Sequence, residues 1–234
     1  MTAPIIQIAG VRNWDEAEMI SASGATHIGF PLHLDVHRPD LSDEAVARII
    51  RQLPSVIRPV LITYLAKATA IYELLQQIGC NIVQLHGAVS VAELEKLRRL
   101  SRSESLPAMA IEIWKSLVVK AGNEQELLQT FGATAPFVDA FITDTYDPVT
   151  GASGATGKTH DWNITRRIVA KSPRPVIVAG GLHPGNVAEA IRITGAAGVD
   201  VHTGVEDANG CKDPRLVTAF VENAKESYHK TGGL

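Results

Sequence analysis

The sequence predicts an α/β fold, a single-domain (β/α)8 TIM barrel over residues 1–234, on the basis of three observations. Eight short apolar runs alternate with amphipathic stretches at a spacing of about 25 to 30 residues, the length of a repeated strand–helix unit. Most of the runs are nearly continuous in aliphatic residues, as parallel strands covered on both faces are. No linker rich in Pro, Gly and Ser divides the chain. A doubly wound open sheet is the alternative arrangement of the same units.

The eight apolar runs give the order of the predicted strands. Each run is short, and each is followed by residues that favour a turn or a helix start. The predicted strands are Ile5–Ala9, Thr26–Pro31, Val60–Tyr64, Asn81–Leu85, Ile113–Val118, Ala140–Asp144, Pro175–Ala179 and Gly198–His202. Closure of the barrel would make the last of these strands a neighbour of the first.

Helix start and stop signals lie between the strands. Ser42 is a predicted N-cap before a helix that ends at Pro54, with acidic residues in its first turn. Ser90 and Glu93 have the spacing of a capping box at the start of a second helix. The main irregular stretch, residues 146–162, follows a strand, so we expect it to be a working loop.

Composition and charge exclude several function classes. The net charge of −3, with Lys and Arg spread along the chain, argues against nucleic acid as a partner and leaves a small anionic ligand open. The cysteines Cys80 and Cys211 lack metal-ligand spacing and fit a reducing cytoplasm. No apolar run reaches the roughly 18 residues of a membrane span. We therefore expect a cytoplasmic protein without a membrane partner, a monomer or a homodimer.

Polar residues at the carboxyl ends of the predicted strands are the candidate active-site groups, because barrel active sites form there. Each of them alone could instead cap the helix that follows. The candidates are Gln7 beside Ala9 on the first strand, Gln84 and His86 on the fourth, Lys115 on the fifth, Asp144 on the sixth, and Asp200 and His202 on the eighth.

A glycine pair after the seventh strand predicts a phosphate site. Gly180 and Gly181 follow a buried run, and Asn186 is positioned to cap the next helix. Thr203 and Gly204 follow the eighth strand, so backbone N–H groups from two adjacent turns could bind a phosphate. A pair of tight turns without a ligand is the alternative interpretation.

Two other patterns carry less weight. The stretch GASGATGKT does not match G-x-x-x-x-G-K-[ST], because Ala152 stands where the first glycine is required. His33, Asp35 and His37 share a side of an extended segment, which could indicate a metal site, but a solvated surface loop is the favoured interpretation. No metal site is predicted.

The order of several motifs resembles a known family. The chain carries QIAG, HRPDLS, NIVQLHG, IWKS, FITDTYDP…GATGKTHDW, PVIVAGGLHPGNVAEA and GVDVHTGVE. Together they resemble the phosphoribosylanthranilate isomerase family of tryptophan biosynthesis. The resemblance implies a TIM barrel, a phosphorylated sugar-type substrate and an Amadori rearrangement. In this reaction, N-(5′-phosphoribosyl)anthranilate becomes a 1-deoxyribulose 5-phosphate without a metal or organic cofactor.

The resemblance also assigns roles to positions of this sequence. Asp144 matches the general acid of the family, and Arg38 matches the arginine that holds the anthranilate carboxylate. Further positions match in two groups: Gly180, Gly181, Thr203 and Gly204 at the phosphate, and Gln7, Ala9, Gln84, His86 and Asp200 around the substrate.

The first strand departs from the family at two positions. The family reads K-I-C-G there, with the cysteine as general base, whereas this chain has Gln7 and Ala9. A methyl group cannot accept a proton. Residues of equal parity share a strand face, so His202 should point inward with Asp200, beside the first strand. We hypothesise that His202, where the family has serine, replaces the missing base.

Three functions remain open from the sequence. The first is the isomerase reaction with Asp144 as acid and a replacement base. The second is a phosphosugar isomerase or lyase of different specificity, with a pocket rebuilt around Gln7, His33, Asp35 and His202. The third is a non-catalytic phosphosugar-binding protein, which the loss of the cysteine would favour.

Overall fold

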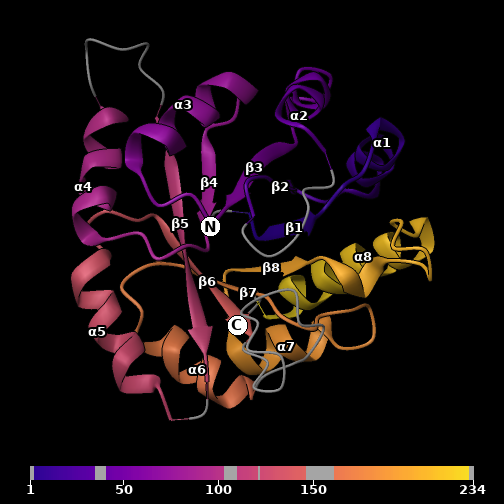
Figure 1. Cartoon of the computed structure of the whole chain (residues 1–234). Coiled ribbons are helices and arrows are strands. Elements are labelled where there is room, and N and C mark those ends of the chain that lie inside the picture. The colour runs from indigo at the N-terminus through magenta and orange to yellow at the C-terminus, as the bar shows by residue number, and fades with distance from the viewer. Residues whose placement is uncertain (1–2, 35–40, 103–109, 121, 146–160, 232–234) are drawn as a thin grey trace.

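Eight parallel strands close into a barrel in sequence order (Figure 1). The computed structural model describes residues 3–34, 41–102, 110–120, 122–145 and 161–231. The strands are β1 (Ile5–Ala9), β2 (His27–Pro31), β3 (Arg58–Thr63), β4 (Ile82–Leu85), β5 (Glu112–Val119), β6 (Ala140–Thr145), β7 (Val176–Val178) and β8 (Gly198–Val201). β8 pairs with β1, which confirms the predicted barrel and contradicts the open-sheet alternative.

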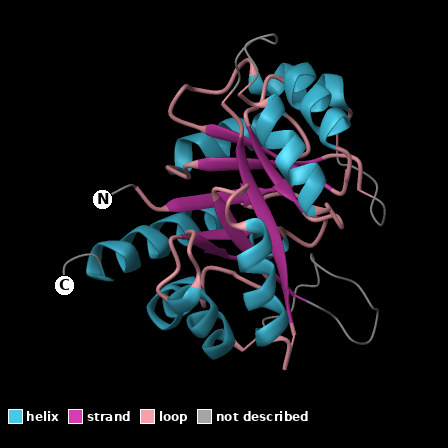
Figure 2. Cartoon of the chain, turned by 90° about the vertical axis from the view of Figure 1, so that its left-hand side faces the viewer, coloured by secondary structure: helices cyan, strands magenta, loops and turns pink. Residues whose placement is uncertain are grey.

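Helices surround the barrel on its outside (Figure 2). They are α1 (Trp14–Ser23), α2 (Asp43–Ile50), α3 (Ala68–Ile78), α4 (Val91–Leu100), α5 (Glu124–Thr134), α6 (Trp162–Lys171), α7 (Val187–Thr194) and α8 (Pro214–Thr231), with a 3₁₀ helix, η1 (Thr203–Val205), before α8. Among the described residues, no helix is long and apolar enough to cross a membrane.

The predicted helix caps at Ser42 and Ser90 are confirmed, with one difference at the capping box. The hydroxyls of Ser42 and Ser90 accept backbone N–H groups of α2 and α4. The carboxylate of Glu93 does not complete the box at Ser90. It accepts the N–H of Ala68, the first residue of α3, at 2.8 Å. Glu93 therefore stabilises the start of the neighbouring helix, a contact that sequence spacing within α4 does not reveal.

The apolar core has two parts, as expected for a barrel. The larger part lies between the strands and the helices. The smaller part fills the barrel interior and consists of Ala9, Val60, Ile62, Ile82, Trp114, Ala140, Ile142, Ile177 and Ala179. Gln7, Gln84 and Asp200 lie on the same inward face of their strands and are buried. Side-chain alternation thus places polar residues in an otherwise apolar interior.

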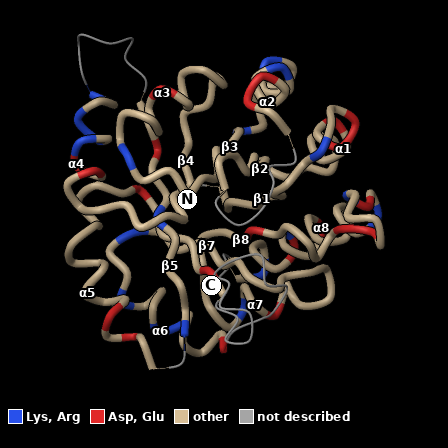
Figure 3. The backbone as a smooth tube through the Cα atoms, viewed as in Figure 1, with Lys and Arg blue, Asp and Glu red and all other residues tan. Residues whose placement is uncertain are grey.

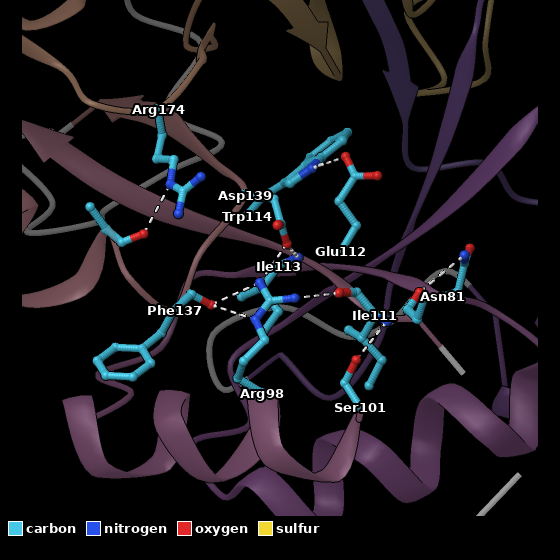
Figure 4. Close-up of polar contacts among 12 residues, drawn as sticks. Asn81, Arg98, Ser101, Ile111, Glu112, Ile113, Trp114, Phe137, Asp139 and Arg174 are labelled. Carbon is cyan, nitrogen blue, oxygen red and sulfur yellow. Dashed lines mark hydrogen bonds and ion pairs between the residues drawn. The ribbon is translucent and has the colours of Figure 1, made fainter. Parts of the chain in front are cut away.

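Arg98 of α4 connects the segments that lead into β5 and β6 (Figure 4). Its guanidinium donates to the carbonyl of Ile111 at 2.8 Å, to the carbonyl of Phe137 at 2.9 Å and to Asp139 Oδ2 at 2.6 Å. The Arg98 side chain is 14% exposed. Asp139 also accepts the N–H of Ile113. These contacts lie at the amino-terminal end of the barrel, where residues serve stability.

We expect Arg98→Met to lower the free energy of unfolding by about 2 kcal/mol, because the substitution leaves two backbone carbonyls and Asp139 without their charged donor. Urea unfolding followed by circular dichroism measures this change. Arg99→Met is the matched control, since Arg99 is the exposed neighbour on the same helix. Equal losses in the two variants would show that the Arg98 contacts do not contribute specifically.

Charged residues are distributed over the outer helices in the described part of the chain (Figure 3). Lys and Arg alternate with Asp and Glu, and several form ion pairs between neighbouring helices, such as Arg167 and Lys171 of α6 with Glu124 of α5. The expectation that nucleic acid is not a partner stays a prediction from charge.

Candidate functional site

A chain of hydrogen bonds crosses the barrel interior. Gln7 Nε2 donates to Asp200 Oδ1 at 2.8 Å and to Gln84 Oε1 at 2.9 Å. Gln84 Nε2 lies 2.6 Å from His86 Nε2, and His86 Nδ1 lies 2.9 Å from Asp144 Oδ2. Five of the residues predicted from sequence are therefore brought together, from strands β1, β4, β6 and β8. Gln7 has no exposed surface, so its role is to hold the side chains of Asp200 and Gln84 in place.

Asp144 ends this chain at the carboxyl end of β6. Its Oδ2 accepts from His86 and, at 3.4 Å, from the Ser116 hydroxyl, while its Oδ1 accepts the N–H of Thr145 at 2.9 Å. The side chain is 6% exposed. Both oxygens are thus held in place, so the carboxyl group has a fixed orientation.

Asp200 lies at the other end of the chain. Burial raises the pKa of its carboxyl group to about 6, because desolvation disfavours the charged form. The hydrogen bond from Gln7 opposes this shift by stabilising the carboxylate. Asp200 is consequently ionised at neutral pH, and its ionisation is less favourable than in water.

His202 follows the last residue of β8 and lies next to the end of β1. In the β1–β8 register Gln7 pairs with Asp200 and Ile8 pairs with Val201, the residue before His202. The imidazole packs on Gly10, where a Cβ would overlap the ring and where φ is +76°. Glycine at this position allows the histidine to approach the first strand.

Two residues that the sequence analysis missed surround His202. Its Nε2 lies 3.4 Å from Glu206 Oε1. Lys212, whose side chain is fully buried, donates to the same Glu206 oxygen at 2.7 Å and to the His202 carbonyl at 2.9 Å. Glu206 is the last residue of the GVE motif, and Lys212 is the first residue of KDP. The sequence gives no signal that Lys212 is buried, because its neighbour Cys211 is exposed.

The two predicted phosphate turns are in contact. Gly180 and Gly181 have φ values of +96° and +62°, in the left-handed region that favours glycine. A Cβ on Gly180 would overlap Thr145, and one on Gly204 would overlap the carbonyl of Leu182. The turn after β7 is therefore packed against both the end of β6 and the turn of η1. The space at Gly180 and Gly204 is too small for a side chain, so glycine is required at both positions.

Asn186 has a different role from the predicted one. It precedes α7, but its side chain makes no capping hydrogen bond to that helix. Its Oδ1 accepts the N–H of His183 at 2.8 Å and its Nδ2 donates to the carbonyl of Gly181 at 3.0 Å. The prediction of an Asn186 cap is wrong, because these contacts within the loop use both ends of the amide. Asn186 instead fixes the carbonyl side of the glycine turn.

Other candidates lie away from the interior chain or outside the described residues. Lys115 donates to the carbonyl of Gly87 at 3.2 Å, and burial lowers the pKa of its ammonium group. The inward residue of β5 at this level is Ser116. His33 lies 3.0 Å from Asp43. Arg38, Asp35 and His37 lie outside the described ranges. Within those ranges, no group of three or more His, Cys, Asp or Glu side chains could hold a metal ion.

Comparison with known sequences gives a consistent result. Residues 6–223 match the profile of the family described as N-(5′-phosphoribosyl)anthranilate (PRA) isomerase. A curated relative, N-(5′-phosphoribosyl)anthranilate isomerase 2 of Methanosarcina mazei, is 37% identical over 230 residues, covering 98% of this chain and 97% of the relative.

Solved structures show the same likeness. The crystal structure of phosphoribosyl anthranilate isomerase from Thermotoga maritima has a TM-score of 0.78 and 28% identity, covering 97% of this chain and 100% of that one. Another crystal structure of this isomerase, in complex with reduced 1-(o-carboxyphenylamino)-1-deoxyribulose 5-phosphate, has a TM-score of 0.76 and 26% identity, with the same coverage. Both likenesses extend over the whole barrel.

Proposed function

This chain belongs to the N-(5′-phosphoribosyl)anthranilate isomerase family, and we propose that it converts N-(5′-phosphoribosyl)anthranilate, or a related phosphorylated aminosugar, by an Amadori-type isomerisation. One observation carries the proposal: the glycine turn after β7 packs on Thr145, the residue next to Asp144. A phosphate on the turns of Gly181 and Gly204 would thus place the attached sugar within reach of a buried carboxyl group.

In the proposed reaction, Asp144 donates a proton to the ring oxygen of the sugar, so that the C1–O bond of the furanose breaks and a protonated imine forms. A base then removes the proton from C2, which gives an enolamine. Proton return to C1 and loss of the hydroxyl proton at C2 complete the ketose. The reaction is an internal redox exchange between C1 and C2 and needs no external oxidant or reductant. Arg38 is the proposed partner of the anthranilate carboxylate.

His202 is the proposed base. Support comes from the contact of its ring with Gly10, the residue that follows Ala9 at the end of β1. Ala9 itself carries only a methyl group and is 3% exposed. An imidazole is a competent general base at neutral pH. Glu206, 3.4 Å from Nε2, is positioned to stabilise the imidazolium that forms on proton removal.

A fluorescence assay of N-(5′-phosphoribosyl)anthranilate turnover tests this assignment. We expect His202→Ala to lower the turnover number about 10²-fold or more, in line with the usual contribution of a general base. Ala9→Cys in the same background should restore part of the loss, because it returns a thiol to the end of β1. His229→Ala is the control, since His229 is exposed on α8. Full activity in His202→Ala would contradict the role of His202.

Because Ala9 replaces the family cysteine, two alternative functions remain: a non-catalytic phosphosugar-binding protein, and an isomerase or lyase of different specificity. The same assay distinguishes these alternatives. If the wild-type chain binds a phosphorylated analogue and only Ala9→Cys turns the substrate over, the pocket is intact and lacks its base. If neither turns over, the substrate assignment is wrong.

A further inference from the structure

The hydrogen-bond chain between Asp200 and Asp144 has a defined direction. A carboxylate only accepts hydrogen bonds, so Gln7 must present its amide nitrogen to Asp200, 2.8 Å away. The same nitrogen donates to Gln84 Oε1 at 2.9 Å. The carbonyl of Gln84 therefore faces Gln7, and its amide nitrogen faces His86. Each amide is oriented by the residue before it, starting from the charge on Asp200.

This direction determines where His86 carries its proton. An amide nitrogen is a donor only, and Gln84 Nε2 lies 2.6 Å from His86 Nε2, so His86 Nε2 must be the acceptor and carry no proton. The proton of the neutral ring is then on Nδ1, which lies 2.9 Å from Asp144 Oδ2. The chain leaves no place for a second proton on this imidazole.

We propose that Gln7, Gln84 and His86 are positioning residues that hold the His86 ring as the neutral Nδ1–H tautomer and so give Asp144 a neutral hydrogen-bond donor. The inference rests on the proposed role of Asp144 as general acid. An imidazolium beside Asp144 would strongly favour its carboxylate and make it a poor proton donor. A neutral N–H donor fixes the carboxyl group in place with a smaller effect on its ionisation.

The other groups around His86 agree with this arrangement. Its side chain is 13% exposed and packs against the ring of Tyr64, with 5.8 Å between ring centroids. The ammonium group of Lys115 is directed to the carbonyl of Gly87. Among the described charged residues, Asp144 is therefore hydrogen-bonded to the imidazole directly, and Asp200 is connected to it through the amides of Gln7 and Gln84.

Nitrogen NMR of the histidine rings tests the proposal without reference to turnover. Protein labelled with ¹⁵N-histidine is measured at pH 7.5, and the His86 signals are assigned by their loss in His86→Asn. We expect one proton, on Nδ1, in the wild type. In Gln84→Glu a carboxylate replaces the donor at Nε2, so both ring nitrogens should carry protons. Gln52→Glu, the same change on the surface, should leave the His86 signals unchanged.

Turnover of N-(5′-phosphoribosyl)anthranilate provides the second measurement. We expect Gln84→Glu to lower the turnover number at least tenfold with less than a threefold change in KM. His86→Asn should be more active than His86→Leu, because the asparagine amide can occupy the place of Nδ1 and keep a neutral donor to Asp144. A loss of turnover in Gln84→Glu equal to that in Gln52→Glu would contradict the proposal.

The two measurements separate this inference from the proposed function. A wild-type His86 ring with its proton on Nε2, or a Gln84→Glu ring that stays singly protonated, would overturn the inference whatever the activity. A wild type that shows the Nδ1–H tautomer but turns over no substrate would overturn the proposed function instead. If Gln84→Glu does not fold, Gln84→Met is used. This variant removes the donor to His86 Nε2. If the His86 proton then stays on Nδ1 to the same extent as in the wild type, Gln84 does not determine the tautomer.

Discussion

Replacement of Asp144 by asparagine is expected to lower the turnover number for N-(5′-phosphoribosyl)anthranilate by about 10²- to 10⁴-fold, the range typical of a lost general acid. The amide cannot give a proton to the ring oxygen, but it keeps an acceptor for the His86 Nδ1–H group, which lies 2.9 Å from Asp144 Oδ2. Binding of a phosphorylated product analogue should change by less than about threefold, because asparagine has nearly the shape of aspartate and leaves the backbone N–H groups of the proposed phosphate turns unchanged.

Ser116→Ala is the matched control for Asp144→Asn. It removes only the 3.4 Å contact of the serine hydroxyl with Asp144 Oδ2 and leaves the other two hydrogen bonds of the carboxyl group. We expect its turnover number to stay within about threefold of the wild type, since a contact of this length is weak. Steady-state kinetics and analogue titration on the same preparations distinguish the effects. A comparable loss in both variants would argue for a positional effect rather than loss of the acid.

The fold could be predicted from sequence because most strands are almost unbroken aliphatic runs that alternate with helices about eight times. That pattern is typical of parallel strands buried on both faces, and the number of units favours a closed barrel over an open sheet. The strand at Ile5–Ala9 was predicted with its observed bounds, and the others differ by at most two residues at an end. The element ends are less predictable, because the last residues of a strand are determined by packing and not by the local pattern.

The residues of the interior hydrogen-bond chain could be named from the sequence, and their connections could not. The family resemblance placed Gln7 and Asp200 together around the pocket, and both side chains are buried in the barrel interior and hydrogen-bonded to each other. On β5, Lys115 alternates with the inward Ser116, and its ammonium group reaches the carbonyl of Gly87 instead of the interior hydrogen-bond chain. The contact from Gln84 through His86 to Asp144 joins strands that are not neighbours in the sheet, and no local spacing contains it.

The same limit applies to Glu93 and Lys212. Glu93 has the sequence spacing of a cap for its own helix, yet its carboxylate binds the start of the adjacent helix at Ala68. Lys212 reads as a surface residue in the segment KDP, yet its side chain is fully buried against Glu206. The Glu93 side chain reaches a partner from another strand–helix unit, which only the assembled barrel determines. The Lys212 side chain reaches its partners within the segment between β8 and α8, where the fold of the chain determines its burial.

Asp200→Asn is expected to stabilise the protein at neutral pH. Burial raises the pKa of Asp200 to about 6 from its ordinary value of 3.8. Between these two values the folded chain binds more protons than the unfolded chain, so this group makes the free energy of unfolding fall as pH rises. Above pH 6 the full penalty for ionising the buried carboxyl group is present. Asparagine carries no such penalty, and its amide can pair with the Gln7 amide in either orientation.

The difference in unfolding free energy between Asp200→Asn and the wild type should therefore be small near pH 4 and grow through pH 6. Its upper limit is about 3 kcal/mol, since the shift is about two pH units and each unit corresponds to about 1.4 kcal/mol. Urea unfolding at several pH values measures it, with Glu18→Gln as the control because Glu18 is exposed on α1. A difference that does not depend on pH would show that Asp200 ionises in the folded chain as easily as in water.

Turnover should fall in the stabilised variant. An uncharged residue 200 no longer requires Gln7 to present its amide nitrogen, so the hydrogen-bond chain from residue 200 to Asp144 loses its fixed direction.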